Sequence, residues 1–181
     1  MQALNERQSV RTFTKDTLTL QQLSDLLWAA WGINRADQNK RTAPSSRNVQ
    51  EIELYISLQT GLYLYNAGSN SLKQVSTKDI RNITGTQDFV AEAYLNLVYV
   101  ADLSKYGKKE GDVINDSDLL VSYVNTGFIA QNVYLYCASA DLGCVVRGLV
   151  PKENLIKEMG LRSNQKIILA QTVGVPQKKI N

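Results

Sequence analysis

Two arginines four residues apart flank a serine near the start of the chain, in the segment Arg7-Gln8-Ser9-Val10-Arg11. A guanidinium is a planar fork of donors that stays protonated and can bind phosphate oxygens bidentately. Ser9 adds a neutral donor on the same short segment. The cluster therefore indicates a site for the phosphate of a cofactor, although an ordinary solvated basic segment would have the same composition.

The rest of the side-chain inventory limits the chemistry that is possible. The chain has no histidine, which excludes Ser-His-Asp and Cys-His catalysis and removes the commonest ligand of transition metals. Cys137 and Cys144 lie in or beside an apolar stretch, and we expect them to be small buried hydrophobes. We predict no metal site and no catalytic side chain, so that in an enzyme a cofactor would carry the reaction and the protein would position it.

Length and charge narrow the class of protein. A chain of 181 residues is predicted to form one domain over 1–181, or one protomer of an intertwined oligomer. The net charge of +3 is modest and the basic residues are scattered, which argues against a nucleic-acid partner. No apolar run approaches the roughly 18 to 20 residues of a membrane span. The polar segment 1–6 lacks the apolar core of a secretory signal, so we expect a cytoplasmic location unless an export signal has been removed.

Apolar periodicity predicts an α+β fold. Apolar residues recur at helical spacing from Leu20 to Trp31, Thr19 and Gln22 have the spacing of a capping box, and Gly32 is typical of a helix end. From Ile52 the period changes to two, which predicts a strand over 52–58 with one buried face. The same criteria predict strands over 62–65, 72–75, 95–101 and 167–173, an extended stretch over 144–146, and short helices over 89–94 and 151–160.

The longest predicted helix begins at Asp116 and ends at Leu142. Several of its faces are apolar, which is typical of a helix that is buried centrally or lies in an oligomer interface. The segment 34–46 is polar and predicted to be a loop, and a turn is predicted at Arg147-Gly148. We therefore expect a mixed, mainly antiparallel sheet flanked by helices.

Four separated stretches can now be considered together. They are Arg7-x-Ser9-x-Arg11-x-Phe13, Ala43-Pro44-Ser45-Ser46-x-Asn48, Leu142-Gly143-Cys144 followed by Arg147-Gly148, and Gly174-Val175-Pro176-x-Lys178-Lys179. In this order and at these spacings they resemble the nitroreductase family of FMN-dependent oxidoreductases, over nearly the whole chain.

Three further features are similar to the branch of that family that contains the azoline-oxidising dehydrogenases of modified peptides. They are Leu26-Leu27-Trp28-Ala29-Ala30-Trp31-Gly32, the meander Gly61-Leu62-Tyr63-Leu64-Tyr65, and Gln87 ahead of Val90-Ala91-Glu92-Ala93.

The resemblance implies an intertwined homodimer with two FMN molecules in clefts at the subunit interface. It implies the following sites. The ribityl phosphate would be held by Arg7, Gln8, Ser9 and Arg11, with Lys178 or Lys179. The flavin ring would be contacted from the partner subunit by Pro44, Ser45, Ser46 and Asn48, although Ser45 or Ser46 could equally cap a helix. Backbone N–H groups of Val146, Arg147 and Gly148 would point at flavin N5, where they would stabilise negative charge.

Three positions leave alternatives open. Many relatives have an acidic residue where Arg147 aligns, so Arg147 would either raise the flavin potential or be an ordinary surface arginine. Gln87 would bind substrate or flavin, or be a plain loop residue. One of five tyrosines could cover the substrate, or all could pack in the core: Tyr94, Tyr99, Tyr123, Tyr134 and Tyr136.

The resemblance predicts the activity of the chain. We expect an FMN-dependent oxidoreductase that uses NADH or NADPH to reduce a small organic acceptor, of nitroaromatic or quinone type, by a ping-pong mechanism. The alternatives are a flavin-dependent dehydrogenase of azoline rings in modified peptides and a flavin-binding protein without turnover. An interaction module without any cofactor would be colourless when purified.

Overall fold

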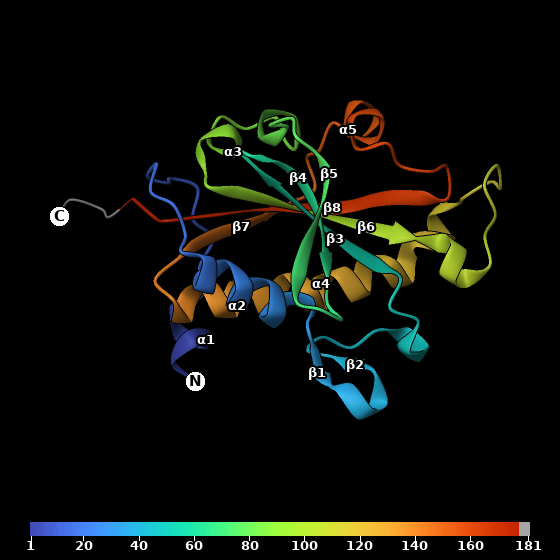
Figure 1. The fold of residues 1–181 in the computed structure, drawn as a ribbon, viewed down its shortest axis with the longest axis horizontal. Coiled ribbons are helices and arrows are strands. Elements are labelled where there is room, and N and C mark those ends of the chain that lie inside the picture. The colour runs from blue at the N-terminus through green and yellow to red at the C-terminus, as the bar shows by residue number, and fades with distance from the viewer. Residues whose placement is uncertain (178–181) are drawn as a thin grey trace.

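The computed structural model describes residues 1–177 and contains a six-stranded sheet with helices on both faces (Figure 1). The strand order is β5-β4-β3-β6-β8-β7, and each neighbouring pair is antiparallel. The strands are β3 (Ile52–Leu58), β4 (Gly61–Asn66), β5 (Ser71–Ser76), β6 (Leu95–Asp102), β7 (Gly143–Arg147) and β8 (Gln165–Gly174). The predicted α+β architecture with a mainly antiparallel sheet is therefore confirmed.

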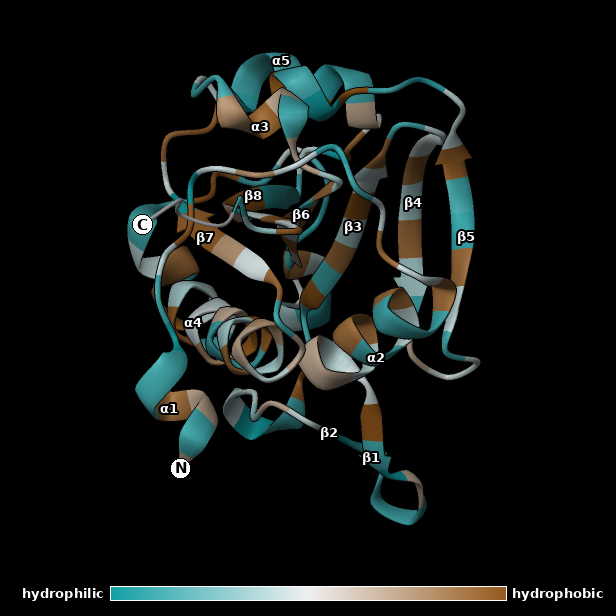
Figure 2. Ribbon diagram, turned by 90° about the vertical axis from the view of Figure 1, so that its left-hand side faces the viewer, coloured by the Kyte–Doolittle hydropathy of each residue, from teal (hydrophilic) through white to brown (hydrophobic). Residues whose placement is uncertain are grey.

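Helices form a layer on each side of this sheet (Figure 2). On one side lie α2 (Leu20–Trp31) and α4 (Asp116–Ser139), with the short α1 (Gln2–Glu6) against α4. On the other side lie α3 (Phe89–Glu92) and α5 (Lys152–Met159). A small two-stranded sheet, β1 (Ile33–Arg35) and β2 (Lys40–Arg41), stands apart from the main sheet.

The two faces of the sheet bury two separate apolar clusters. The larger cluster fills the space between the sheet and the pair α2 and α4, and includes Leu26, Tyr99 and Ile129. The smaller cluster includes Val98 and Leu155 and lies on the α5 side. Since Val98 and Tyr99 are consecutive in β6 and belong to different clusters, β6 is a central strand buried on both faces.

The predicted start of α2 is confirmed in detail. Gln22 N–H donates to Thr19 Oγ1 at 3.1 Å, and Thr19 N–H donates to Gln22 Oε1 at 2.9 Å, so both halves of the capping box are present. Gly32 ends the helix with φ −70°, which any residue can adopt. It is needed for space, because a Cβ there would lie 2.6 Å from the carbonyl oxygen of Trp28.

One predicted helix end and one predicted loop differ from the structure. Helix α4 ends at Ser139 and not at Leu142, because Asp141 takes the left-handed conformation (φ 54°) and Leu142 N–H bonds back to Cys137 O at 2.9 Å. The segment 34–46, predicted to be a loop, includes the last two residues of β1 and the whole of β2.

Two further elements differ in detail. The helical turn predicted over 89–94 ends at Glu92, where Ala93 becomes extended. Strand β7 includes Arg147, which we predicted in a turn.

Candidate functional site

The N-terminal segment that carries the arginine cluster runs along the free edge of β7. Val10 N–H donates to Cys144 O at 2.9 Å, and Ser9 forms a parallel bridge with Cys144. Two glycines of the family motifs permit this close approach. A Cβ on Gly143 would lie 2.8 Å from Val10 Cγ1, and a Cβ on Gly174 would lie 3.0 Å from Phe13 Cδ1. The first, third and fourth motifs are therefore packed against one another.

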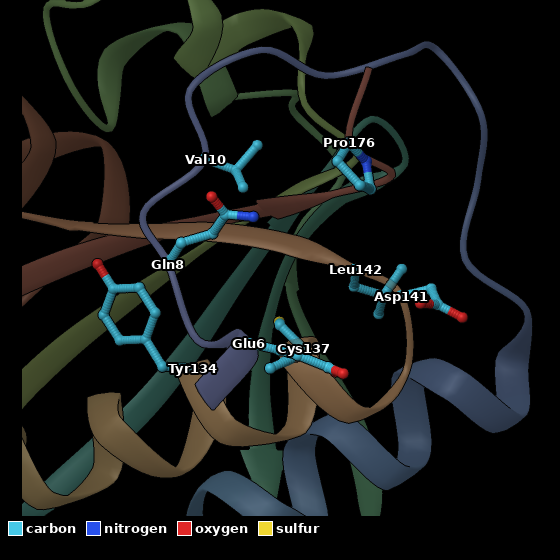
Figure 3. Close-up of a pocket in the computed structure, with 9 residues that line it drawn as sticks. Glu6, Gln8, Val10, Tyr134, Cys137, Asp141, Leu142 and Pro176 are labelled. Carbon is cyan, nitrogen blue, oxygen red and sulfur yellow. The ribbon is translucent and has the colours of Figure 1, made fainter. Parts of the chain in front are cut away.

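Tyr134 of α4 joins three of the predicted site residues. Its hydroxyl oxygen accepts a hydrogen bond from Val146 N–H at 3.0 Å and lies 2.9 Å from Ser9 Oγ. The guanidinium carbon of Arg7 lies 5.2 Å from the centroid of the same ring, a cation–π distance. Figure 3 shows Tyr134 reaching from α4 towards the segment that carries Gln8 and Val10. The sequence offered Tyr134 only as one of five tyrosines without a role, since contacts over 125 residues leave no local pattern.

A cleft of about 480 Å³ lies between this segment and the C-terminal end of α4. Its lining includes Gln8, Tyr134 and the carboxylates of Glu6 and Asp141, and does not include Arg7, Ser9 or Arg11. Side chains alternate along an extended segment, so the basic residues and Gln8 belong to opposite sides. The acidic residues Glu6 and Asp141 in the lining disfavour binding of a phosphate dianion in this cleft. Gln8 therefore lies apart from Arg7, Ser9 and Arg11, with which it was predicted to bind phosphate.

Arg147 is not a surface residue. Its side chain is only 5% exposed, and it donates to Thr172 Oγ1 at 3.0 Å, Thr84 O at 2.8 Å and Asn96 Oδ1 at 3.1 Å. These acceptors are neutral, and desolvation lowers the pKa of Arg147 to about 10. The guanidinium thus remains protonated at neutral pH and carries a buried positive charge that ties the 84–96 region to β7 and β8.

The direction of each N–H group along β7 determines which of them could face flavin N5. Val146 N–H points away from β8, at the edge of the sheet, and donates to Tyr134. Residues of an antiparallel pair alternate in direction, so the N–H of Arg147 points towards its partner Ala170 in β8. Gly148 lies in a bend directly after β7, so the alternation does not extend to its N–H. The expectation that these amides face N5 therefore stays a prediction for Gly148.

The turn at 44–48 is held by a buried polar network. Ser46 N–H donates to Asn125 Oδ1 at 3.3 Å, and Asn125 Nδ2 donates to both carboxylate oxygens of Glu51, at 2.9 and 3.2 Å. Ser45 caps no helix here, since its Oγ accepts from Gln50 N–H at 3.1 Å instead. The backbone is left-handed at Arg47, Asn48 and Gln50, with φ of 51°, 54° and 57°. Such conformations cost roughly 1–2 kcal/mol each in non-glycine residues, which explains why the turn needs the network.

The structure does not bring all the predicted site residues together within one chain. Asn125, beside the 44–48 turn, and Tyr134, beside Ser9, are nine residues apart in α4, which is about 13 Å along a helix. The phosphate cluster and the turn therefore lie towards opposite ends of α4 (Figure 1). Lys178 and Lys179 lie outside the described residues.

Gln87 precedes α3, and its Oε1 atom is buried without a hydrogen-bond partner among residues 1–177. An acceptor of this kind is typical of a position that a ligand or water completes.

Both cysteines are buried thiols, 1% exposed, as predicted. Burial raises the pKa of Cys137 well above its usual range, so it is a poor nucleophile. We expect native protein at pH 8 to leave both thiols unreacted with Ellman's reagent for many minutes, while the same sample in guanidinium chloride releases two equivalents. Rapid reaction of either thiol in the native sample would contradict this packing.

Within the described part of the chain, no group of three or more Cys, Asp or Glu residues is arranged to hold a metal ion. No helix of this part is long and apolar enough to cross a membrane.

Comparison with known proteins identifies the family. The sequence model of the nitroreductase family matches residues 4–175. A Ralstonia eutropha protein whose crystal structure is described as that of a "putative nitroreductase" is 40% identical, with a TM-score of 0.90 over 99% of this chain and 83% of that one. The chain belongs to the nitroreductase family.

One further relative and one more distant structure are also similar to this chain. A "putative nitroreductase" of Methanocaldococcus jannaschii is 28% identical over 94% of this chain and 88% of its own length. The NADPH:FMN oxidoreductase of Vibrio harveyi, complexed with NAD⁺, shares the fold with a TM-score of 0.71 at 21% identity, over 97% of this chain and 68% of that one. The resemblance drawn from the four motifs is confirmed.

Proposed function

We propose that this protein is an FMN-dependent oxidoreductase in which NADH or NADPH supplies two electrons for the reduction of a small organic acceptor. Membership of the nitroreductase family supports an oxidoreductase that uses a flavin. The Vibrio harveyi relative, by its name, uses NADPH and FMN. The donor set along the β7 edge is the observation in this chain that carries the proposal.

The donors suit the phosphate of FMN. Arg7 and Arg11 form no ion pair with an acidic side chain among residues 1–177, so their charges are available to an anion. Ser9 lies between them, is exposed, and has its hydroxyl close to a second hydroxyl that can complete its hydrogen bonding. A phosphate dianion needs about two opposing charges and several donors, and this segment supplies both.

The remaining site residues would position the ring. When bound, FMN would supply the two-electron chemistry at N5, so the protein would need no His, Cys or metal of its own. The N–H of Gly148, directly after β7, would be available to flavin N5, and the buried charge of Arg147 lies on the α3 side of the sheet. The charge of Arg147 favours electron uptake by the ring, and Gln87 Oε1 is available to a donor on substrate or flavin.

The complete site requires a second copy of the chain. Because the 44–48 turn lies far from the phosphate cluster in one chain, we propose that Pro44, Ser45, Ser46 and Asn48 of one subunit contact the flavin held by the other. The outer face of α4 supports this arrangement, since Leu120, Val124 and Phe128 repeat every fourth residue and are 65%, 52% and 45% exposed. An apolar stripe of this kind is typical of an interface.

Dimer formation gives a direct prediction. Sedimentation should give about twice the chain mass of 20.2 kDa. The pair Val124→Asp and Phe128→Asp should shift the protein to monomers and abolish retention of FMN, because charges on the stripe oppose association. Val75→Asp, at an exposed valine on β5, is the matched control and should leave both properties unchanged. A wild-type monomer that retains FMN would remove the two-chain site.

Turnover is tested by anaerobic mixing of FMN-loaded protein with NADH or NADPH. The proposal predicts loss of the visible flavin bands within seconds and their return on addition of a quinone. Steady-state rates at several quinone concentrations should give parallel double-reciprocal lines, as expected for ping-pong kinetics. Bands that persist with both nicotinamides would contradict the proposal and favour an azoline dehydrogenase with another electron partner or a flavin-binding protein without turnover.

A further inference from the structure

The hydroxyl of Tyr134 uses both its donor and its acceptor capacity in one arrangement of the hydrogen bonds among residues 1–177. Val146 N–H can only donate, so the phenol oxygen is the acceptor of that 3.0 Å bond. Tyr134 has one hydroxyl proton and is 8% exposed. Among residues 1–177 the acceptor within reach of that proton is Ser9 Oγ, at 2.9 Å. If Ser9 donated instead, the Tyr134 proton would have no acceptor among residues 1–177.

The direction of these hydrogen bonds determines whether Ser9 can donate to a ligand. With its oxygen accepting from Tyr134, its own proton is free to point away from the protein, on the exposed side of the segment. The bonds run in one direction, from Val146 N–H to Tyr134 and from Tyr134 to Ser9, and each polarises the next. Ser9 is therefore arranged as a donor to a negatively charged oxygen.

Tyr134 also supports the first arginine of the cluster. The guanidinium carbon of Arg7 lies 5.2 Å from the centroid of the Tyr134 ring, so the ring face limits the positions that this long side chain can take. One side chain of α4 thus contacts two of the three donors proposed for the phosphate.

We propose that Tyr134 is a positioning residue for the phosphate of the flavin: its hydroxyl makes Ser9 a donor, and its ring holds Arg7. The proposal rests on the proposed function and deepens it, because it predicts that Tyr134 distinguishes FMN from riboflavin, which has the same ring and no phosphate. The residue acts through Ser9 and Arg7 and makes no contact of its own with the reacting atoms.

The test compares dissociation constants for FMN and riboflavin, measured by quenching of flavin fluorescence. Tyr134→Phe removes the hydroxyl and keeps the ring, and should weaken FMN binding about 10-fold, the effect of one hydrogen bond to a charged group. Riboflavin binding should change less than 2-fold. Tyr134→Leu removes the ring as well and should weaken FMN binding further. A variant with a general folding defect would weaken both flavins together.

Tyr136→Phe is the matched control on the same helix. The Tyr136 hydroxyl donates to Gln22 O at 3.1 Å, away from Ser9, so the ratio of FMN to riboflavin affinity should stay at the wild-type value. The double variant Ser9→Ala/Tyr134→Phe tests the path of the effect. If Tyr134 acts through Ser9, the FMN affinity of the double variant should equal that of Ser9→Ala alone.

Three outcomes would overturn the proposal. They are an unchanged FMN affinity in Tyr134→Phe, an equal loss for FMN and riboflavin, and effects of Ser9→Ala and Tyr134→Phe that simply add. A wild-type protein that binds neither flavin would overturn the proposed function itself, which is a separate and recognisable result.

Discussion

Replacing Arg7 and Arg11 together with alanine should weaken FMN binding by about 100-fold or more. A hydrogen bond to a charged group contributes about 1.5–3 kcal/mol, and 1.4 kcal/mol corresponds to a tenfold change in affinity. Both guanidiniums are free of acidic side chains among residues 1–177, so their loss should cost little folding stability. Fluorescence titration with FMN gives the affinity, and sedimentation should show an unchanged association state.

A charge-matched control separates local binding from general electrostatic attraction. Lys73 lies on β5 and Lys157 on α5, and both are exposed. Lys73→Ala/Lys157→Ala lowers the net charge by the same amount and should change FMN affinity less than 3-fold at 0.15 M salt, where distant charges are screened. Equal losses in the two double variants, or none in Arg7→Ala/Arg11→Ala, would refute the phosphate assignment.

Replacing Arg147 with methionine should destabilise the protein by about 2–4 kcal/mol, because each buried acceptor left without a donor costs about 1–3 kcal/mol. The substitution leaves Thr84 O and Thr172 Oγ1 without the guanidinium donor in a buried region, while Asn96 Oδ1 keeps its hydrogen bond from Thr172. Urea unfolding at pH 7 measures the free energy. Arg162→Met is the control, since Arg162 is 43% exposed in its ion pair with Asp102 and should contribute less than about 1 kcal/mol.

The pH dependence of this effect follows from the direction of the pKa shift. The pKa of Arg147 in the folded protein, about 10, lies below its ordinary value because burial desolvates the guanidinium. The unfolded chain therefore binds the proton more tightly, and stability from this group rises with pH only above about 10. Between pH 6 and 8.5 Arg147 is protonated in both states, so the destabilisation by Arg147→Met should be constant there. A loss of unfolding free energy below about 1 kcal/mol in Arg147→Met, or a loss that changes by more than about 1 kcal/mol between pH 6 and 8.5, would contradict the account.

Most elements could be predicted because their hydrophobic patterns agree with their environments. The helix over 20–31 and the strand over 52–58 lie at the predicted residues. The prediction of one buried face for that strand is wrong, because Tyr55 and Ile56 of β3 are buried in separate clusters on its two faces. The β1–β2 hairpin was missed since its polar sequence has no period to detect. The end of α4 was misplaced because apolar spacing continues to Leu142, while the left-handed Asp141 ends the helix earlier.

The site was predictable where donors are close in sequence and not where contacts join distant segments. Arg7, Ser9 and Arg11 stand out as a cluster within five residues. The contacts of Tyr134 with Ser9, and of Arg147 with Thr84, span 125 and 63 residues. Their partners are determined by how α4 and the 84–96 region pack against the sheet, which no local pattern contains. The buried pair Glu51 and Asn125, which fixes the 44–48 turn, was missed for the same reason.

The most direct test of the central claim is the visible absorption spectrum of the purified protein after incubation with FMN and removal of free flavin by desalting. A flavoprotein with the phosphate site described above should retain flavin bands near those of free FMN, with about one flavin per chain. Incubation with riboflavin should leave much less flavin bound, because the phosphate contacts are absent. A colourless protein after incubation with FMN would contradict the account.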